Sequence, residues 1–178
     1  MTGPLLPPGR PAGPRVPIPP DVAAEIFAPT VQLPTVEDTR ALGARLAPVL
    51  RAGDLIVLTG PLGAGKTALV QGVGAGLGVA GNVVSPTFVI ARVHRGPLPL
   101  VHVDAYRLRS LDEVDDLDLD VDVEDAVTVV EWGSGLVEQL TEARLEIALS
   151  RSDDSEERTA RLIPHGGDWP ARLAHVLS

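Results

Sequence analysis

The residues best able to do chemistry lie in one short run, Gly-Pro-Leu-Gly-Ala-Gly-Lys-Thr at 60–67. The pattern Gly-x-x-x-x-Gly-Lys-Thr is typical of a loop that binds the phosphates of a nucleotide. Gly60, Gly63 and Gly65 let the backbone turn tightly and bring its amides up to phosphate oxygens. The lysine then bridges the outer phosphates, and the threonine hydroxyl ligates the accompanying magnesium ion. A glycine-rich turn that binds nothing is the alternative, and the strand and helix expected on either side oppose it.

Lysine occurs once in this chain, at Lys66. The sequence has fifteen basic residues, so the other fourteen are arginine. A compact ammonium suits the inside of a phosphate-binding loop, whereas arginine serves where a general positive charge is enough. The choice favours a functional role for Lys66.

A site of this kind also needs a carboxylate near the metal, usually at the carboxyl end of a neighbouring apolar strand. Asp104 ends the run Leu-Val-His-Val-Asp at 100–104, and Glu131 ends Val-Thr-Val-Val-Glu at 127–131. Each could instead be an ordinary acid at a strand end. We interpret His102, inside the first run, as a satisfied strand histidine rather than a ligand.

Aromatic rings are scarce, and three of the five lie beside these motifs: Phe88, Tyr106 and Trp132. This placement predicts walls that keep water out of a site. Core packing is the alternative, above all for Phe88.

The elements that must position these residues alternate between strand and helix. A β-branched run at 54–59 is typical of a strand buried on both faces, and the apolar segment 68–79 predicts the helix after the loop. Thr35 starts a capping-box-like helix whose apolar face continues to residue 50. Further strands are expected at 87–94, 98–103, 126–131, 144–149 and 158–163, helical turns within 108–118 and 134–140, and a helix at 169–177. This order predicts an α/β fold, a three-layer sandwich of the phosphate-loop NTPase kind with a mainly parallel or mixed central sheet.

The chain divides near residue 34. Ten of the seventeen prolines fall within residues 1–34, so we expect 1–33 to be a disordered, mostly extended extension. Packing of this segment over the domain surface is the alternative. Residues 34–178 then form the phosphate-loop domain, which is long enough for one core.

The net charge is −9, and nine acids with no base lie within 112–125. Phosphate contacts need clustered Lys and Arg, so we expect a partner to carry any nucleic acid. The acidic run either faces a basic partner or is a solvated loop. With no cysteine, no apolar run of about 20 residues and prolines throughout the amino terminus, a cytoplasmic location is expected.

Together these residues resemble the TsaE (YjeE) family, bacterial ATPases of tRNA threonylcarbamoyladenosine biosynthesis. The resemblance is carried by 60–67, Ser-Pro-Thr-Phe at 85–88, His-Val-Asp-Ala-Tyr-Arg-Leu at 102–108 and Val-Glu-Trp at 130–132, and it covers roughly 34–150. It implies a protein that binds and hydrolyses ATP with Mg2+, with low activity alone, to support a complex of TsaB and TsaD. TsaD carries the transferase site and handles the tRNA, so tRNA is reached only indirectly, and no membrane is involved.

The resemblance also implies roles for individual residues. Thr67 and Glu131 would ligate magnesium, and Asp104 would order a water or an outer ligand. With Lys66, these two acids form the expected catalytic set. Residues 85–88 would be mobile, with Thr87 near the metal. The expected nucleotide-binding set is Gly60, Gly63, Ala64, Gly65, Lys66, Thr67, Ala68 and Trp132.

The sequence departs from the family pattern at three positions. Pro61 follows the first loop glycine where Asp is frequent, Ala68 replaces a second hydroxyl residue, and Ala105 replaces a bulkier apolar residue. Pro61 stiffens the entry to the loop without removing a required ligand.

Three other classes of protein could use a loop of this kind. A small metabolite kinase could use Arg107 and Arg109, although no lid segment is evident. A scaffold that binds nucleotide without turnover is opposed by the intact lysine, threonine and two acids. A GTPase needs an Asn-Lys-x-Asp motif, which cannot form because the one asparagine is Asn82 and the one lysine is Lys66.

Overall fold

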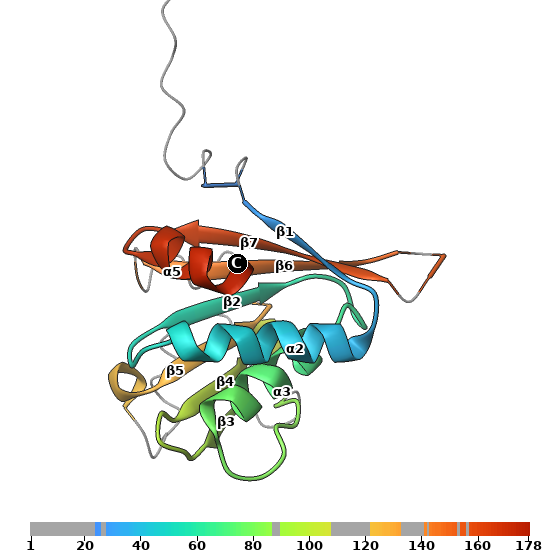
Figure 1. The fold of residues 1–178 in the computed structure, drawn as a ribbon. Coiled ribbons are helices and arrows are strands. Elements are labelled where there is room, and N and C mark those ends of the chain that lie inside the picture. The colour runs from blue at the N-terminus through green and yellow to red at the C-terminus, as the bar shows by residue number, and fades with distance from the viewer. Residues whose placement is uncertain are drawn as a thin grey trace, which may run out of the picture.

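Seven strands of the described residues form one mixed sheet (Figure 1). The computed structural model describes residues 24–25, 28–86, 90–107, 122–132, 141, 143–152, 154–155 and 157–178. The strands are β1 (Thr30–Leu33), β2 (Leu55–Thr59), β3 (Ala91–His94), β4 (Leu100–Asp104), β5 (Val127–Glu131), β6 (Arg144–Arg151) and β7 (Arg158–His165). The helices are α2 (Val36–Leu46), α3 (Lys66–Leu77) and α5 (Trp169–Leu177), with short 3-10 helices η1 (Ala47–Val49), η2 (Ala105–Arg107) and η3 (Val123–Asp125).

Strand β2 lies at the centre of the sheet, in the order β1-β7-β6-β2-β5-β4-β3. It pairs in parallel with β5 and β6, and β5 pairs in parallel with β4. The remaining pairs are antiparallel. Leu55 to Leu58 are all buried, as expected for a strand covered on both faces. The predicted α/β class and mixed sheet are confirmed, and the carboxyl ends of β2, β4 and β5 meet at one edge.

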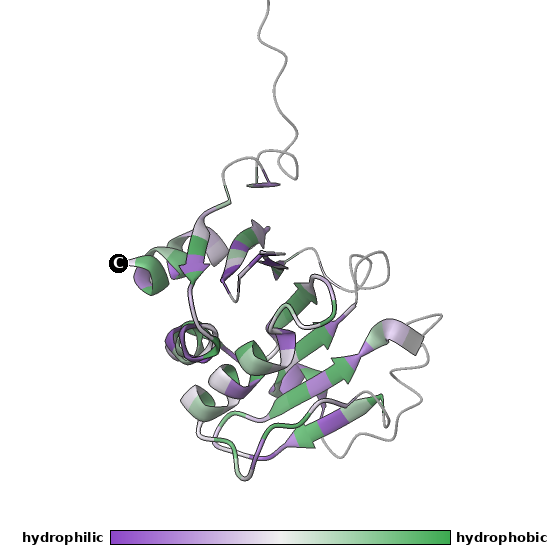
Figure 2. Ribbon diagram, turned by 90° about the vertical axis from the view of Figure 1, so that its right-hand side faces the viewer, coloured by the Kyte–Doolittle hydropathy of each residue, from purple (hydrophilic) through white to green (hydrophobic). Residues whose placement is uncertain are grey.

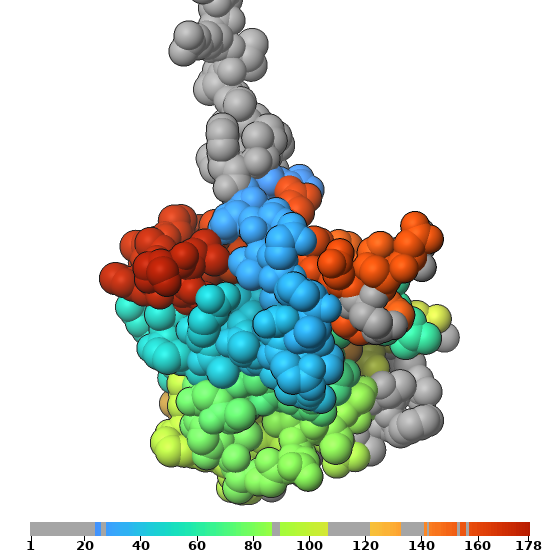
Figure 3. All heavy atoms as spheres, turned by 45° about the vertical axis from the view of Figure 1, so that its right-hand side comes forward, coloured from blue at the N-terminus to red at the C-terminus, as the bar shows by residue number. Residues whose placement is uncertain are grey.

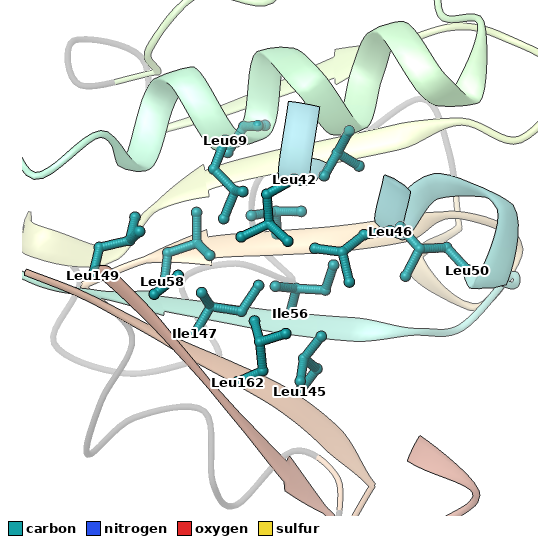
Figure 4. Close-up of a cluster of buried hydrophobic side chains, with 14 of the residues drawn as sticks. Leu42, Leu46, Leu50, Ile56, Leu58, Leu69, Leu145, Ile147, Leu149 and Leu162 are labelled. Atoms are coloured by element: carbon teal, nitrogen blue, oxygen red, sulfur yellow. The ribbon is translucent and has the colours of Figure 1, made fainter. Parts of the chain in front are cut away.

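The described helices cover one face of this sheet (Figure 2). Their apolar side chains interlock with alternate residues of the strands (Figure 4), among them Leu42 and Leu46 of α2, Leu69 of α3, Ile56 and Leu58 of β2 and Ile147 of β6. Trp169 and Leu173 of α5 belong to the same cluster. The opposite face carries a smaller cluster that includes Val57, Val101 and Val103. A second helical layer, the third layer of the predicted sandwich, is not seen within the described residues.

Two glycines let α2 and α3 approach each other closely. A Cβ atom at Gly43 would collide with the carbonyl oxygen of Leu69, and one at Gly72 with that of Arg40. Larger residues at these positions would push the helices apart. Because α3 begins at Lys66, this packing fixes the direction in which the loop at 60–67 enters the helix.

Helix α2 has the capping box expected at Thr35. The Asp38 amide donates to the Thr35 hydroxyl at 3.1 Å, and the Thr35 amide donates to the Asp38 carboxylate at 2.9 Å. These bonds satisfy amides that have no partner within the helix. Pro48 lies in η1. Because proline has no amide donor and its ring does not fit inside an α-helix, the helical segment ends here.

Helix α5 packs beside η1 and α2. Figure 3 shows the blue residues of β1 and α2 lying between red carboxyl-terminal residues and green residues of the central segment. The Arg172 guanidinium holds α5 in this position. Its Nε donates to the Val49 carbonyl at 2.9 Å, and its two terminal nitrogens donate to the Asp54 carboxylate. The planar group also lies over the Trp169 ring, 3.9 Å from the centroid.

The sheet begins earlier than expected from the proline-rich amino terminus. Thr30–Leu33 pairs antiparallel with Arg158–Arg161 of β7, so ordered structure starts before the expected boundary at residue 34. Pro29 lies just before the strand, and its carbonyl accepts a hydrogen bond from the Leu162 amide. This proline therefore does not interrupt the strand pairing. Most of 1–33 lies outside the described residues.

Other expectations also fall outside the described part of the chain. They are the helical turns within 108–118 and 134–140, Thr87 and Phe88, and most of the acidic run 112–125. The strand expected at 87–94 is seen at Ala91–His94. No helix among the described residues has the length and apolar character needed to cross a membrane.

Candidate nucleotide-binding site

The loop at 60–67 connects the carboxyl end of β2 to the first turn of α3. Gly65 is the residue at the amino-terminal cap of α3, with a φ of 103°, and Gly60 has a φ of 135°. Both values favour glycine. A side chain at Gly60 would also collide with the Leu149 carbonyl of β6. The loop therefore takes a course that presents the amino terminus of α3, with its partial positive charge, to a concave surface.

Lys66 is buried, with 5% of its surface exposed. Its Nζ donates to the carbonyl oxygens of Gly60 at 2.8 Å and Pro61 at 3.0 Å. Burial lowers the pKa of Lys66 below its ordinary value, and the charges of Glu131 and Asp104 act in the opposite direction. An ammonium held among carbonyls and poorly hydrated is suited to pair with an anion such as phosphate.

The two predicted acids meet at the same edge of the sheet. Asp104 ends β4, Glu131 ends β5, and the two residues are register partners in the parallel pair. Both are buried, 6% and 4% exposed. Oε1 of Glu131 accepts from the Thr67 hydroxyl at 3.4 Å and lies 2.8 Å from Nε2 of His102. The structure thus places the expected metal-ligand pair, Thr67 and Glu131, side by side.

Asp104 has a different environment from Glu131. Its Oδ1 accepts from the Tyr106 amide at 3.0 Å, and its own amide donates to the Ile90 carbonyl at 2.7 Å. These bonds fix the residue at the junction between β4 and η2. Glu131 therefore contacts α3 through Thr67, whereas Asp104 contacts the turn that follows its own strand.

Two of the three aromatic residues expected at a site are found together. The rings of Tyr106 and Trp132 meet edge to face, with centroids 5.8 Å apart. Lys66 Nζ lies 4.1 Å from the Trp132 centroid. The Trp132 amide donates to the Leu58 carbonyl at 3.1 Å, which continues the pairing of β5 with β2 past Glu131.

These groups surround a cavity of about 610 Å³, a size within the usual range for a small-molecule site. Its walls include the expected Gly63, Gly65, Lys66, Thr67, Ala68, Asp104, Glu131 and Trp132, together with Val36, Leu62, Ser85, Tyr106 and Arg158. Gly60 and Ala64 are not among the lining residues. The Ala64 methyl is part of the main core, and the Gly60 carbonyl accepts from Lys66. Both residues therefore support the loop without lining the cavity.

Arg158 is a lining residue that the sequence motifs do not indicate. Val36 is the first residue of α2, and Arg158 is the first of β7. Arg158 is buried, and a Cβ at Gly65 would lie 3.3 Å from its Cδ. Its position depends on the antiparallel pairing of β6 and β7, in which Arg151 faces Arg158. A local sequence pattern does not predict this pairing between strands.

The residues present fit a nucleotide with magnesium. The amino terminus of α3 and the Lys66 ammonium supply the positive groups that phosphates need. Thr67 and Glu131 supply hard oxygen donors. Within the described residues no group of three or more His, Asp or Glu side chains could hold a metal, and magnesium in nucleotide sites typically takes one or two carboxylates with phosphate and water.

Comparison with known proteins gives one family. Residues 33–160 match the family model described as threonylcarbamoyl adenosine biosynthesis protein TsaE. The tRNA threonylcarbamoyladenosine biosynthesis protein TsaE of Streptomyces coelicolor is 64% identical over 147 residues, 78% of this chain and 99% of the relative. The protein of that name from Mycobacterium tuberculosis is 52% identical over 141 residues, 74% and 84% of the two chains. The crystal structure of Bacillus subtilis YdiB superposes with a TM-score of 0.70 and 30% identity, covering 84% of this chain and 93% of that one.

Proposed function

Because this chain belongs to the TsaE family of tRNA threonylcarbamoyladenosine biosynthesis proteins, we propose that it binds and hydrolyses ATP in support of that tRNA modification. The observation that carries the proposal is that a buried Lys66, the Thr67 hydroxyl and the Glu131 carboxylate lie together at the amino terminus of α3. A structural turn does not need a desolvated ammonium facing two buried acids.

In this proposal, the phosphates of ATP bind to the loop amides and to Lys66. Thr67 and Glu131 hold Mg2+, which would neutralise charge on the phosphates and orient them. Asp104, fixed by the Tyr106 amide, orders a water. Trp132 and Tyr106 limit the access of bulk water to the reacting groups. Each role belongs to a residue that lines the same cavity.

The proposed partners are TsaB and TsaD, with tRNA reached only through that complex in the cytoplasm. Support comes from the relatives, which are named for tRNA threonylcarbamoyladenosine biosynthesis, and from the charge of this chain. A net charge of −9 opposes direct binding of a polyanion, because nucleic-acid affinity rests on Lys and Arg contacts to phosphates. A partner that handles the tRNA resolves this conflict.

The test is ATP hydrolysis by the purified chain, alone and with TsaB, TsaD and tRNA. We expect slow release of inorganic phosphate alone and stimulation only when both partners are present. The Lys66→Ala variant is the inactive control, and TsaD without TsaB is the partner control. Transfer of the γ-phosphate to a small acceptor, in place of phosphate release, would identify a metabolite kinase and overturn the proposal.

A further inference from the structure

His102 is a buried histidine that the proposed ATPase chemistry does not use directly. It is the third residue of β4, and none of its surface is exposed. Its register partner on β5 is Val129, two residues before Glu131. Since alternate residues of a strand point to the same face, the side chains at 129 and 131 of β5 share a face. The histidine ring can therefore reach diagonally along that face to the carboxylate.

The contact between the His102 and Glu131 side chains is short and shielded from solvent. Nε2 of His102 lies 2.8 Å from Oε1 of Glu131, and the two side chains are 0% and 6% exposed. The Thr67 hydroxyl reaches the same Oε1 at a longer 3.4 Å. A separation of 2.7–2.9 Å is typical of a strong hydrogen bond to a charged group. His102 is therefore the closer of the two side-chain donors described for Glu131.

The surroundings of the ring identify which nitrogen carries the proton. Nδ1 of His102 is buried and has no hydrogen-bond partner in the part of the chain that the structure describes. A buried N–H without an acceptor is costly, so the proton belongs on Nε2, where the Glu131 carboxylate accepts it. In this tautomer the ring donates a hydrogen bond from Nε2 to Oε1 of Glu131.

We infer that His102 is a positioning residue that fixes the Glu131 carboxylate in the orientation needed to hold magnesium. The inference rests on the proposed function, in which Thr67 and Glu131 are the metal ligands. The Thr67 hydroxyl would also have to ligate the metal, and its contact with Glu131 is the longer one, at 3.4 Å. His102 stays in place and prevents the carboxylate from rotating. Outer partners of this kind typically change metal affinity or activity by about 10- to 100-fold when removed.

Two substitutions of His102 separate positioning from packing. In His102→Gln the amide nitrogen extends about as far as Nε2 and can still donate to Glu131. In His102→Asn the amide is one carbon shorter and cannot reach, although its polarity is the same. We would titrate Mg2+ against each variant and measure the binding of a non-hydrolysable ATP analogue by calorimetry, with melting temperature as the measure of folding.

We expect His102→Asn to raise the Mg2+ concentration for half-maximal analogue binding by about 10- to 100-fold and to lower kcat. Affinity for the analogue without Mg2+ should be unchanged, and His102→Gln should restore most of the Mg2+ response. Equal Mg2+ responses in the wild type and His102→Asn would overturn the inference, as would losses that follow the melting temperature in both variants. Failure of the wild-type chain to bind the analogue would instead overturn the proposed function, and the inference with it.

Discussion

Lys66 Nζ lies 4.1 Å from the centroid of the Trp132 ring, so the ammonium is enclosed between an indole face and the carbonyls of Gly60 and Pro61. The face of a tryptophan attracts a cation, and the ring also shields the ammonium from water. Trp132 reaches this position with a φ of 62°, a conformation that costs a non-glycine residue about 1–3 kcal/mol. The surrounding site therefore enforces the placement of the ring over the lysine.

Replacement of Lys66 by alanine should remove ATP binding. The ammonium makes two hydrogen bonds to loop carbonyls, and phosphate oxygens would take their place in the complex. Hydrogen bonds to charged groups contribute about 1.5–3 kcal/mol each, so affinity should fall about 100-fold or more, beyond detection by calorimetry for a micromolar binder.

The matched control is Arg45→Ala, which removes one positive charge from an exposed position on α2. It should leave ATP affinity near that of the wild type. Unchanged affinity in Lys66→Ala would show that the phosphate site lies elsewhere in the chain.

Replacement of Glu131 by alanine should separate nucleotide binding from turnover. The loop and Lys66 remain, so ATP should still bind, whereas the Thr67 hydroxyl loses the acceptor that lies 3.4 Å away. We expect hydrolysis to fall on the order of 100-fold or more, the usual scale for a positioned catalytic group. Phosphate release, measured with saturating ATP and the partner proteins, tests this. Glu37→Ala, on the exposed side of α2, is the control, and wild-type turnover in Glu131→Ala would remove this acid from the site.

The sequence predicts the parts of the site that follow directly from strands and loops. Lys66, Asp104 and Glu131 each end or begin an element whose apolar pattern is visible locally, and parallel strands bring their carboxyl ends to one edge. The burial of β2 and the capping of α2 are predicted for the same reason. Local chemistry fixes these features, so neighbouring residues are enough to find them.

The remaining features depend on pairing between distant segments. Arg158 reaches the cavity only because β7 pairs with β6, and β1 joins the sheet only because β7 offers it an edge. His102 appears as an ordinary strand histidine until the register of β4 with β5 places it beside Glu131. Register is set by the whole sheet, so a single stretch of sequence carries no signal for it.

Replacement of Arg172 by alanine should destabilise the fold without touching the cavity. The guanidinium is buried and donates to the Val49 carbonyl and to Asp54, whose side chain is 12% exposed. Removing Arg172 leaves the Asp54 carboxylate without its cationic partner and with the Arg51 amide as a remaining donor, at 2.7 Å; losing one partner of a buried pair costs about 3 kcal/mol. Urea unfolding followed by circular dichroism measures the loss. Arg51→Ala removes an arginine that is 65% exposed and should cost no more than about 1 kcal/mol; equal losses in the two variants would contradict the assignment.

Replacement of Asp168 by asparagine should reveal an acid-dependent part of the stability. Desolvation raises the pKa of Asp168, but the hydrogen bonds and charges of Arg51 and Arg172 outweigh it and hold the pKa below the ordinary value of 3.8. Because the folded pKa is lower than the unfolded one, the carboxylate stabilises the fold above pH 3.8 and loses this effect as the pH falls through the folded pKa. The difference in free energy of unfolding between the wild type and Asp168→Asn should therefore be constant near neutral pH and shrink below pH 3.8. Asp154→Asn, at an exposed position between β6 and β7, is the control, and a wild-type advantage over Asp168→Asn that persists unchanged into strong acid would show that these arginines do not stabilise the carboxylate.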